Sequence, residues 1–245
     1  MTARTAPETR ARADERVAAY PLLKSMKRRR ILGWPWWAAL LAAIALAAFA
    51  VVAIGPIREP VLRSLGWALV ASDPVAPADA IVLTIDSGGA GALEAADLVH
   101  DGVSKRVAVF EDPPSGPDFE FIRRGLPYDN ASTRQIRELS ELGLTHVERI
   151  AKIDGTHSEA RALPQWADAQ GLKSIVVVAA KDHSRRLRRV LGRAMKGHPT
   201  RVAVEAARYS NFDPDRWWET RAGVRTEIIE LEKLLLDYLM HPLSF

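Results

Sequence analysis

Two short segments of this chain carry side chains suited to chemistry. In residues 181–186 (KDHSRR), His183 precedes a basic pair, Arg185 and Arg186, where a helix is expected to start. Cations are unfavourable at a helix N-terminus, so two arginines there favour a bound anion such as a phosphate. We therefore assign His183 as an acid/base group or phosphate contact and both arginines as ligand contacts. A solvated basic face is the alternative, because more arginines follow on the same helix.

The second segment is residues 154–159 (DGTHSE). Its histidine and Glu159 could act as general acid and base or bind a hard metal ion. Helix capping explains a threonine or serine at this place without any function. We assign Glu159 as a catalytic candidate beside His183, and Thr156 as a ligand contact that orients or polarises.

A glycine-rich segment, residues 86–91 (DSGGAG), follows an apolar run and opens a helix. Backbone amides at such a helix start can approach an anion. The segment lacks the usual dinucleotide spacing and the Walker lysine, so a tight strand-to-helix turn is the alternative. The ligand-binding candidates here are Asp86, Ser87, Gly88 and Gly89.

The elements that must position these segments alternate between apolar runs and helical patterns. The runs suit strands that are buried on both faces of a parallel sheet. This rhythm predicts an α/β fold: a Rossmann-like, doubly wound, mainly parallel sheet of about five strands. The predicted strands are residues 80–85, 105–110, 146–153, 174–180 and 201–206, and the predicted helices are residues 92–101, 131–142, 158–170, 184–195 and 226–240. In such a sheet, ligands bind beyond the carboxyl ends of the strands near the switch in strand order, which is where the three segments should meet.

The first 55 residues predict a different environment. Residues 36–54 contain no charged or strongly polar side chain, and Lys27 to Arg30 are all basic. About 20 apolar residues span a bilayer, and basic residues stay on the cytoplasmic side. A cleaved signal peptide and a twin-arginine signal are alternatives. The expected layout is a basic cytoplasmic tail (1–30), one N-terminal transmembrane helix acting as a signal anchor (31–55), a linker (56–77) and an extracytoplasmic α/β domain (78–245).

The amino-acid composition excludes several kinds of functional site. The chain has 245 residues and no cysteine, which excludes disulfides, thiolate metal sites and cysteine nucleophiles. Its net charge of +4 comes largely from the basic tail, which favours anionic lipid headgroups over nucleic acid. A metal-dependent hydrolase is a further possibility, but no tight ligand spacing is present, so we assign no metal ligand and identify no cofactor. In the metal-dependent hydrolase alternative, the metal ligands would be Asp86, Glu111, Asp182 and His183.

Residues 78–239 resemble the SanA/ElyC/YdcF family of bacterial envelope proteins. The resemblance rests on ADAIVL, on SIVVVAAKDHSRR with its His-x-x-Arg (His183 and Arg186), and on DRWWETRAG followed by a closing Glu-x-x-Lys helix. This chain departs from the family at Ala92, where an arginine is usual, at residues 110–112, where Ser-Gly-Gly is usual after the second strand, and at residues 156–159, where Thr-x-Glu-Asn is usual.

The resemblance implies a role in envelope or peptidoglycan biogenesis. We therefore expect a protein of the inner or plasma membrane, with its N-terminus in the cytoplasm, that binds a polyprenyl-phosphate or peptidoglycan-related intermediate; whether it also turns that intermediate over stays open. The expected partners are the lipid bilayer, this anionic ligand and other envelope proteins, with no nucleic acid. The departures motivate an alternative, a non-enzymatic scaffold for envelope machinery.

Overall fold

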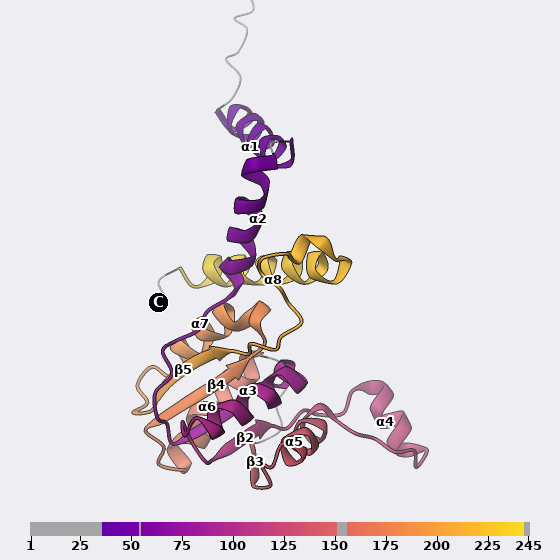
Figure 1. The fold of residues 1–245 in the computed structure, drawn as a ribbon, viewed down its shortest axis with the longest axis vertical. Coiled ribbons are helices and arrows are strands. Elements are labelled where there is room, and N and C mark those ends of the chain that lie inside the picture. The colour runs from indigo at the N-terminus through magenta and orange to yellow at the C-terminus, as the bar shows by residue number, and fades with distance from the viewer. Residues whose placement is uncertain (1–35, 54, 151–155, 243–245) are drawn as a thin grey trace, which may run out of the picture. The chain divides into compact units, whose positions relative to one another are not determined.

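The computed structural model describes residues 36–53, 55–150 and 156–242, without the side chains of residues 48, 51–53 and 156–158 (Figure 1). The predicted basic tail and the start of the predicted membrane segment lie outside these residues. The chain divides into two units, residues 1–48 and 49–245. Helix α1 (Trp36–Ala53) runs across this boundary and is wholly apolar. No helix in the described ranges combines the length and apolar character needed to cross a membrane.

A five-stranded parallel sheet forms the centre of the larger unit. Its strands are β1 (Ala80–Leu83), β2 (Val107–Phe110), β3 (Val147–Ile150), β4 (Ser174–Ala179) and β5 (Arg201–Ala206). Their order across the sheet is β3-β2-β1-β4-β5, and Val82 pairs with Ala108 on one side and Val177 on the other. The predicted Rossmann-like α/β fold and all five predicted strands are confirmed, with the strand order switching between β1 and β4.

Helices cover both faces of this sheet, as the uninterrupted apolar strands require. On one face, Leu163 of α6 (Thr156–Ala169) and Leu187 of α7 (Ser184–Ala194) pack against β1 and β4. On the other, Leu98 of α3 (Gly88–His100) and Leu139 of α5 (Ala131–Glu141) complete the core. All four residues of β1 are fully buried, so the central strand has no solvent-facing side.

Local signals explain where helix boundaries differ from those predicted. Helix α3 begins at Gly88, four residues earlier than predicted, because Gly88 adopts a φ of +47° that turns the chain out of the 3-10 helix η1 (Ile85–Ser87). Helix α8 (Arg221–Met240) begins five residues earlier than predicted, because Thr220 caps it by accepting from the Gly223 amide at 2.9 Å.

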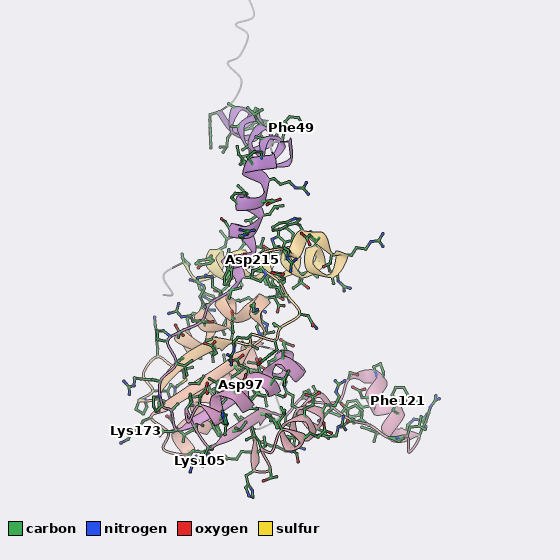
Figure 2. The ribbon with its side chains drawn as sticks, in the orientation of Figure 1. Phe49, Asp97, Lys105, Phe121, Lys173 and Asp215 are labelled. Atoms are coloured by element: carbon green, nitrogen blue, oxygen red, sulfur yellow. The ribbon has the colours of Figure 1, made fainter. Side chains whose placement is uncertain are left out.

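One helix, α4 (Gly116–Arg123), was not predicted. It lies between β2 and α5 and buries none of its residues. Phe119, Phe121 and Ile122 are exposed, and Figure 2 shows Phe121 at a distance from the sheet. The two prolines at 113 and 114 indicated a loop, whereas Ser115 and Asp118 form a capping box that starts the helix.

The predicted linker contains an ordered helix, α2 (Gly55–Leu69), that packs on α8. Its Leu69 shares a small apolar cluster with Phe212, Trp217 and Leu234. Trp217, in the 3-10 helix η3 (Trp217–Glu219), donates its indole N–H to the Leu62 carbonyl at 2.8 Å. Trp217 is therefore a packing anchor. After α2, the Asp73 amide and carboxylate both bond to Val204, which covers the edge of β5.

Candidate functional site

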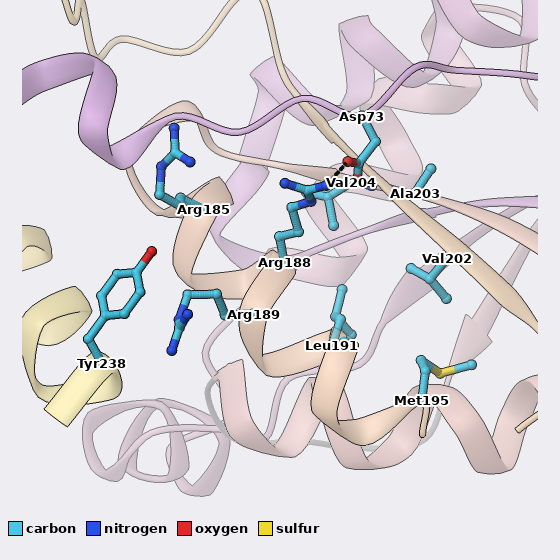
Figure 3. A pocket seen from close by; sticks show the side chains of 11 residues that line it. Asp73, Arg185, Arg188, Arg189, Leu191, Met195, Val202, Ala203, Val204 and Tyr238 are labelled. Carbon is cyan, nitrogen blue, oxygen red and sulfur yellow. Dashed lines mark hydrogen bonds and ion pairs between the residues drawn. The ribbon is translucent and has the colours of Figure 1, made fainter. Parts of the chain in front are cut away.

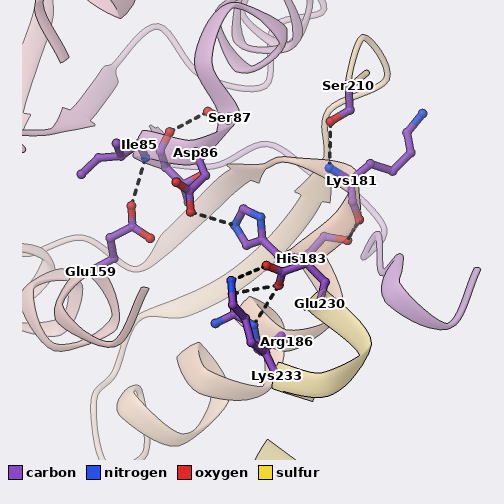
Figure 4. A network of polar contacts seen from close by, with 12 residues as sticks. Ile85, Asp86, Ser87, Glu159, Lys181, His183, Arg186, Ser210, Glu230 and Lys233 are labelled. Carbon is purple, nitrogen blue, oxygen red and sulfur yellow. Dashed lines mark hydrogen bonds and ion pairs between the residues drawn. The ribbon is translucent and has the colours of Figure 1, made fainter. Parts of the chain in front are cut away.

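The candidate site lies at the carboxyl ends of β1 and β4, where the strand order switches. Strand β1 leads into η1 and α3, and β4 leads into the 3-10 helix η2 (Lys181–His183) and α7. Figure 4 shows Asp86, Glu159, His183 and Arg186 gathered at this edge, with Glu230 reaching in from α8. Four side chains singled out in the sequence therefore meet in space, although they come from three separate segments.

Glu159 is the most perturbed acid of this group. Its side chain is buried, and Oε1 accepts a hydrogen bond from the Ile85 amide at 3.0 Å. Its Oε2 has no hydrogen-bond partner in the described part of the chain. Burial raises the pKa of Glu159 to about 7, against the opposing effects of the Ile85 amide and Arg186, and the Asp86 charge raises it further. A carboxyl group with this pKa can give or take a proton near neutral pH.

His183 is the second buried titratable group. Only 3% of the residue is exposed, and its Nε2 lies 4.0 Å from Asp86 Oδ2, too far for a hydrogen bond. Among the described residues, Nε2 has no hydrogen-bond partner. Burial lowers the pKa of His183, although the carboxylates of Asp86 and Asp182 act in the other direction. The imidazole is therefore neutral at pH 7 and has one ring nitrogen available beside an exposed carboxylate.

Arg186 enters the site already paired. Its Nε and Nη2 donate to Glu230 Oε2 at 3.2 and 3.0 Å, and Lys233 donates to Glu230 Oε1 at 2.6 Å. Both Arg186 and Glu230 are nearly buried. Glu230 was not assigned to the site from the sequence, although the closing Glu-x-x-Lys pattern of α8 contains it. Its carboxylate neutralises the guanidinium that we predicted as an anion contact.

Arg185 points away from the site. Its guanidinium donates to the carbonyls of Ala68 at 2.5 Å, Val70 at 2.5 Å and Trp67 at 3.2 Å. These carbonyls lie at and just beyond the C-terminus of α2, where a cation is favoured. The placement of Arg185 is thus explained by capping of α2, with no ligand required.

Ser87 also has an internal role. Its hydroxyl is buried and donates to the Thr84 carbonyl at 2.7 Å. A Cβ on Gly91 would come within 2.1 Å of that hydroxyl, so glycine is required there. Gly88 and Gly89, in contrast, line an open pocket. Thr156 begins α6, but its side chain is outside the described part of the structure.

The four proposed metal ligands do not form a metal-binding cluster in the described part of the chain. Asp112, next to Glu111, accepts hydrogen bonds from the amides of Ala131 at 3.3 Å and Ser132 at 3.1 Å, which serve the start of α5. Glu111 itself lies 3.9 Å from Arg149. Within the described ranges, no three His, Cys, Asp or Glu side chains are arranged to hold a metal ion.

A pocket of about 340 Å³ is lined by Asp86, whose Oδ2 lies 4.0 Å from His183 Nε2, but neither His183 nor Glu159 lines it. Its wall includes the first residues of two long helices, Gly88 to Ala90 of α3 and Ala222 to Gly223 of α8, and Asp182 just before α7. Helix N-termini carry partial positive charge and unpaired amides. Asp86 and Asp182 add two carboxylates to the same wall. The Gly88 amide donates to the Ile85 carbonyl and the Gly223 amide to Thr220 Oγ1, so the pocket offers an anion the helix charge and the remaining amides, beside acceptors for hydroxyl groups.

A second, larger cavity of about 510 Å³ lies between α7, β5 and Tyr238 of α8 (Figure 3). Three arginines line it, and each already has a partner. Arg185 caps α2, Arg188 pairs with Asp73 at 2.7 Å, and Arg189 stacks on Tyr238 at 3.6 Å and donates to Asp237. These contacts account for the arginines as connections between α7 and its neighbours.

Comparison with known proteins yields only distant similarity, among solved structures. No protein-family model and no curated protein matches the chain. Among solved structures, the chain is similar to one described as the crystal structure of the aureusimine biosynthetic cluster reductase domain, with 18% identity and a TM-score of 0.30. The match covers 59% of this chain and 37% of that one. A similarity at this level carries no argument about activity.

Proposed function

We propose that this chain is a membrane-anchored protein of envelope biogenesis whose α/β domain binds a phosphorylated intermediate, either a polyprenyl phosphate or a peptidoglycan-related compound. The observation that carries this proposal is the pocket at the β1–β4 switch point, where the N-termini of α3 and α8 line one wall. Two helix starts around one pocket favour a ligand phosphate more than a single helix start does.

The two pocket carboxylates refine the ligand. Asp86 and Asp182 would repel a bare anion, but they accept hydrogen bonds from hydroxyl groups. A phosphate bound at the helix starts with a hydroxyl-rich glycan group beside the carboxylates satisfies both features. A phosphorylated sugar, free or lipid-linked, is therefore the class that we favour.

Proton transfer is the chemistry that the buried pair could add. Glu159, with its pKa near 7, and the neutral His183 are buried near Asp86, which lines the pocket, although neither of them lines it. Since Arg186 is neutralised by Glu230, we propose that it orients these groups and does not clamp the anion directly. Turnover would then proceed through Glu159 and His183 as acid and base.

Membrane attachment is proposed from the sequence. The apolar residues 36–54 follow a basic cluster, Lys27 to Arg30, and this order is typical of a signal anchor with a cytoplasmic N-terminus. The domain after Gly55 would then lie outside the cytoplasm, in reach of envelope intermediates. This location and these partners are proposals that await direct measurement.

Replacement of Ala222 tests the pocket. Ala222 is an exposed residue in the first turn of α8 and lines the pocket. Ala222→Asp places a carboxylate where we expect the phosphate, and an acid there favours the helix, so the fold should persist while ligand binding falls at least tenfold, equivalent to about 1.4 kcal/mol or more. Native mass spectrometry of the full-length protein, gently extracted from membranes, would compare the bound lipid-phosphate mass.

Ala222→Asn is the matched control, because it has nearly the same size without the charge. Wild type and Ala222→Asn should both retain the ligand mass. Equal retention by Ala222→Asp would place the ligand elsewhere. Loss from both variants would indicate crowding at α8 and not competition with an anion.

A non-enzymatic scaffold is the second candidate function. It is favoured by one observation, that both arginines predicted as anion contacts, Arg185 and Arg186, are engaged within the domain. In that case the anchor and the Trp217 region would matter more than the pocket. A chain lacking the residues before Gly55 that restored full function in cells would argue against the scaffold.

A further inference from the structure

Helix α8 has its polar and apolar faces reversed relative to an ordinary surface helix. Its buried residues are three acids, Glu227, Glu230 and Asp237, together with Leu234. Its solvent side carries large apolar side chains, which we call the α8 outer face. The members of this face and their exposed fractions are Ile228 (60%), Leu235 (60%), Leu236 (47%), Leu239 (69%) and Met240 (64%).

The α8 outer face runs along one side of the helix, and the exposed Glu232, four residues after Ile228 and three before Leu235, also lies on this side. The members of the α8 outer face recur at spacings of seven or eight and eleven or twelve residues, which place them along one side of the helix. Two of the acids on the opposite side are explained by their partners in α7, because Glu230 pairs with Arg186 and Asp237 with Arg189, whereas the carboxylate of Glu227 has no hydrogen-bond partner among the described residues. No such contact inside the domain explains the leucines. An exposed apolar stripe of this kind indicates an interaction surface.

The place where α2 contacts the start of α8 indicates what the α8 outer face contacts. Leu62 and Gly66 of α2 lie against Trp217 and Pro214, beside the start of α8. Gly55, the first residue of α2, is seven residues before Leu62, or about 10 Å along the helix. In Figure 1, α2 rises from the side of α8 that faces away from the sheet. The apolar residues 36–54 directly precede Gly55 in the sequence.

This spacing matches the depth of a lipid headgroup layer. With residues 36–54 in the hydrocarbon core, the bilayer's apolar boundary lies near Gly55. A helix about 10 Å beyond that boundary is in the interfacial region, where amphipathic helices bury their apolar side. Exposed cations are in the same region, namely Arg58 on α2 with Arg221 and Arg225 on α8, as expected opposite anionic headgroups.

We propose that the α8 outer face lies on the bilayer surface, so that the domain is held against the membrane along α8 as well as through its anchor. This inference rests on the proposed membrane anchor and adds a second lipid contact to it. The first turn of α8 also lines the pocket through Ala222. The pocket therefore opens beside the lipid surface, and a lipid-linked phosphate could enter it without leaving the bilayer.

A second copy of the chain fits the α8 outer face less well. An antiparallel pair of these helices would place Arg221 and Arg225 of one copy against Leu239 and Met240 of the other. A parallel pair would place the arginines of both copies together. Neither arrangement places an acid directly opposite these guanidinium groups, although the exposed Glu232 lies on the same side of α8, whereas lipid phosphates can surround them.

The absence of native cysteine allows a direct test. Leu236→Cys in the full-length protein, labelled with a nitroxide and reconstituted into vesicles of phosphatidylglycerol and phosphatidylethanolamine, reports its surroundings through collisions with oxygen and with a water-soluble nickel complex. Lys173→Cys is the control, since Lys173 is exposed before β4, at the opposite end of the strands from the candidate site. We expect the oxygen-to-nickel collision ratio to be several-fold higher at position 236 than at 173.

Three other results would overturn the proposal. Equal, water-like ratios at both positions would show that α8 faces solvent. A label at 236 shielded from both reagents, with a short distance between labels of two molecules, would assign the face to a second copy. An alkaline wash of the vesicles distinguishes failure of the proposed membrane anchor from failure of the proposed α8 contact. A chain that washes off has no anchor. A retained chain with a water-like label at 236 contradicts only the α8 contact.

Discussion

Replacing Asp237 with alanine is expected to lower the free energy of unfolding by about 3–5 kcal/mol, the usual cost of removing one partner from a buried ion pair. Asp237 and Arg189 are both nearly buried. The Asp237 carboxylate accepts from Arg189 Nε at 2.6 Å and from Arg193. Without this carboxylate, the guanidinium groups of Arg189 and Arg193 on α7 would lose the negative charge that Asp237 places beside them.

The measurement is urea unfolding of wild type and Asp237→Ala in parallel. Glu232→Ala is the control, because Glu232 is an exposed acid on the same helix and should change stability by less than about 0.5 kcal/mol. Although burial raises it, the hydrogen bonds from Arg193 and Arg189 hold the pKa of Asp237 below its usual value. Its stabilising contribution should therefore be lost as the pH falls through that lowered pKa. A loss no larger than that of Glu232→Ala would contradict a structural role for this cluster.

Replacing Glu227 with glutamine is expected to stabilise the protein by about 3 kcal/mol at about pH 8 and to have little effect at about pH 4. Glu227 is completely buried, and neither carboxylate oxygen has a hydrogen-bond partner in the described part of the chain. Burial raises its pKa to about 7. Glutamine has nearly the same shape but carries no charge at any pH.

The direction of this effect follows from proton binding. Below the unfolded pKa of about 4.5 the carboxyl is neutral in both states and costs little. As the pH rises towards 7, only the unfolded chain ionises, so the wild type loses stability until the buried acid ionises as well. Burial raises the pKa of Glu159 and Glu205 in the same way, so only the difference between variant and wild type isolates Glu227. An equal gain at both pH values would show that the pKa of Glu227 is not raised, as would follow if its carboxylate found a partner.

Much of the sheet could be predicted because its three central strands, β2, β1 and β4, are short and almost entirely buried. A run such as Ile175 to Val178 has no polar position at which a helix could expose a face, and its branched side chains favour a strand. The order of elements then places His183 and the Asp86 segment at one edge, since the carboxyl ends of parallel strands point the same way. The local pattern of apolar strands followed by polar segments was therefore enough to predict that the candidate site residues lie at this edge of the sheet.

The pairing of charges could not be predicted in this way. Arg185 and Arg186 are adjacent in sequence, yet one contacts α2, more than a hundred residues away, and the other contacts Glu230. Which partner each arginine contacts depends on how the helices pack against one another, and the spacing of residues along the sequence does not indicate it. Helix α4 was not predicted, although Ser115 and Asp118 form a capping box at its start. The resemblance to the SanA/ElyC/YdcF family remains a prediction.

Four consecutive residues at the start of α7 each contact a different part of the larger unit. His183 faces the candidate site, Ser184 accepts from the Ala71 amide at 2.8 Å, Arg185 caps α2, and Arg186 pairs with α8. Adjacent Cα atoms are only about 3.8 Å apart, so these contacts share one short rigid piece of backbone. A mechanical pull on α2 would therefore be carried within a single turn of helix to the imidazole, so the proposed N-terminal anchor would be coupled to the geometry of the site.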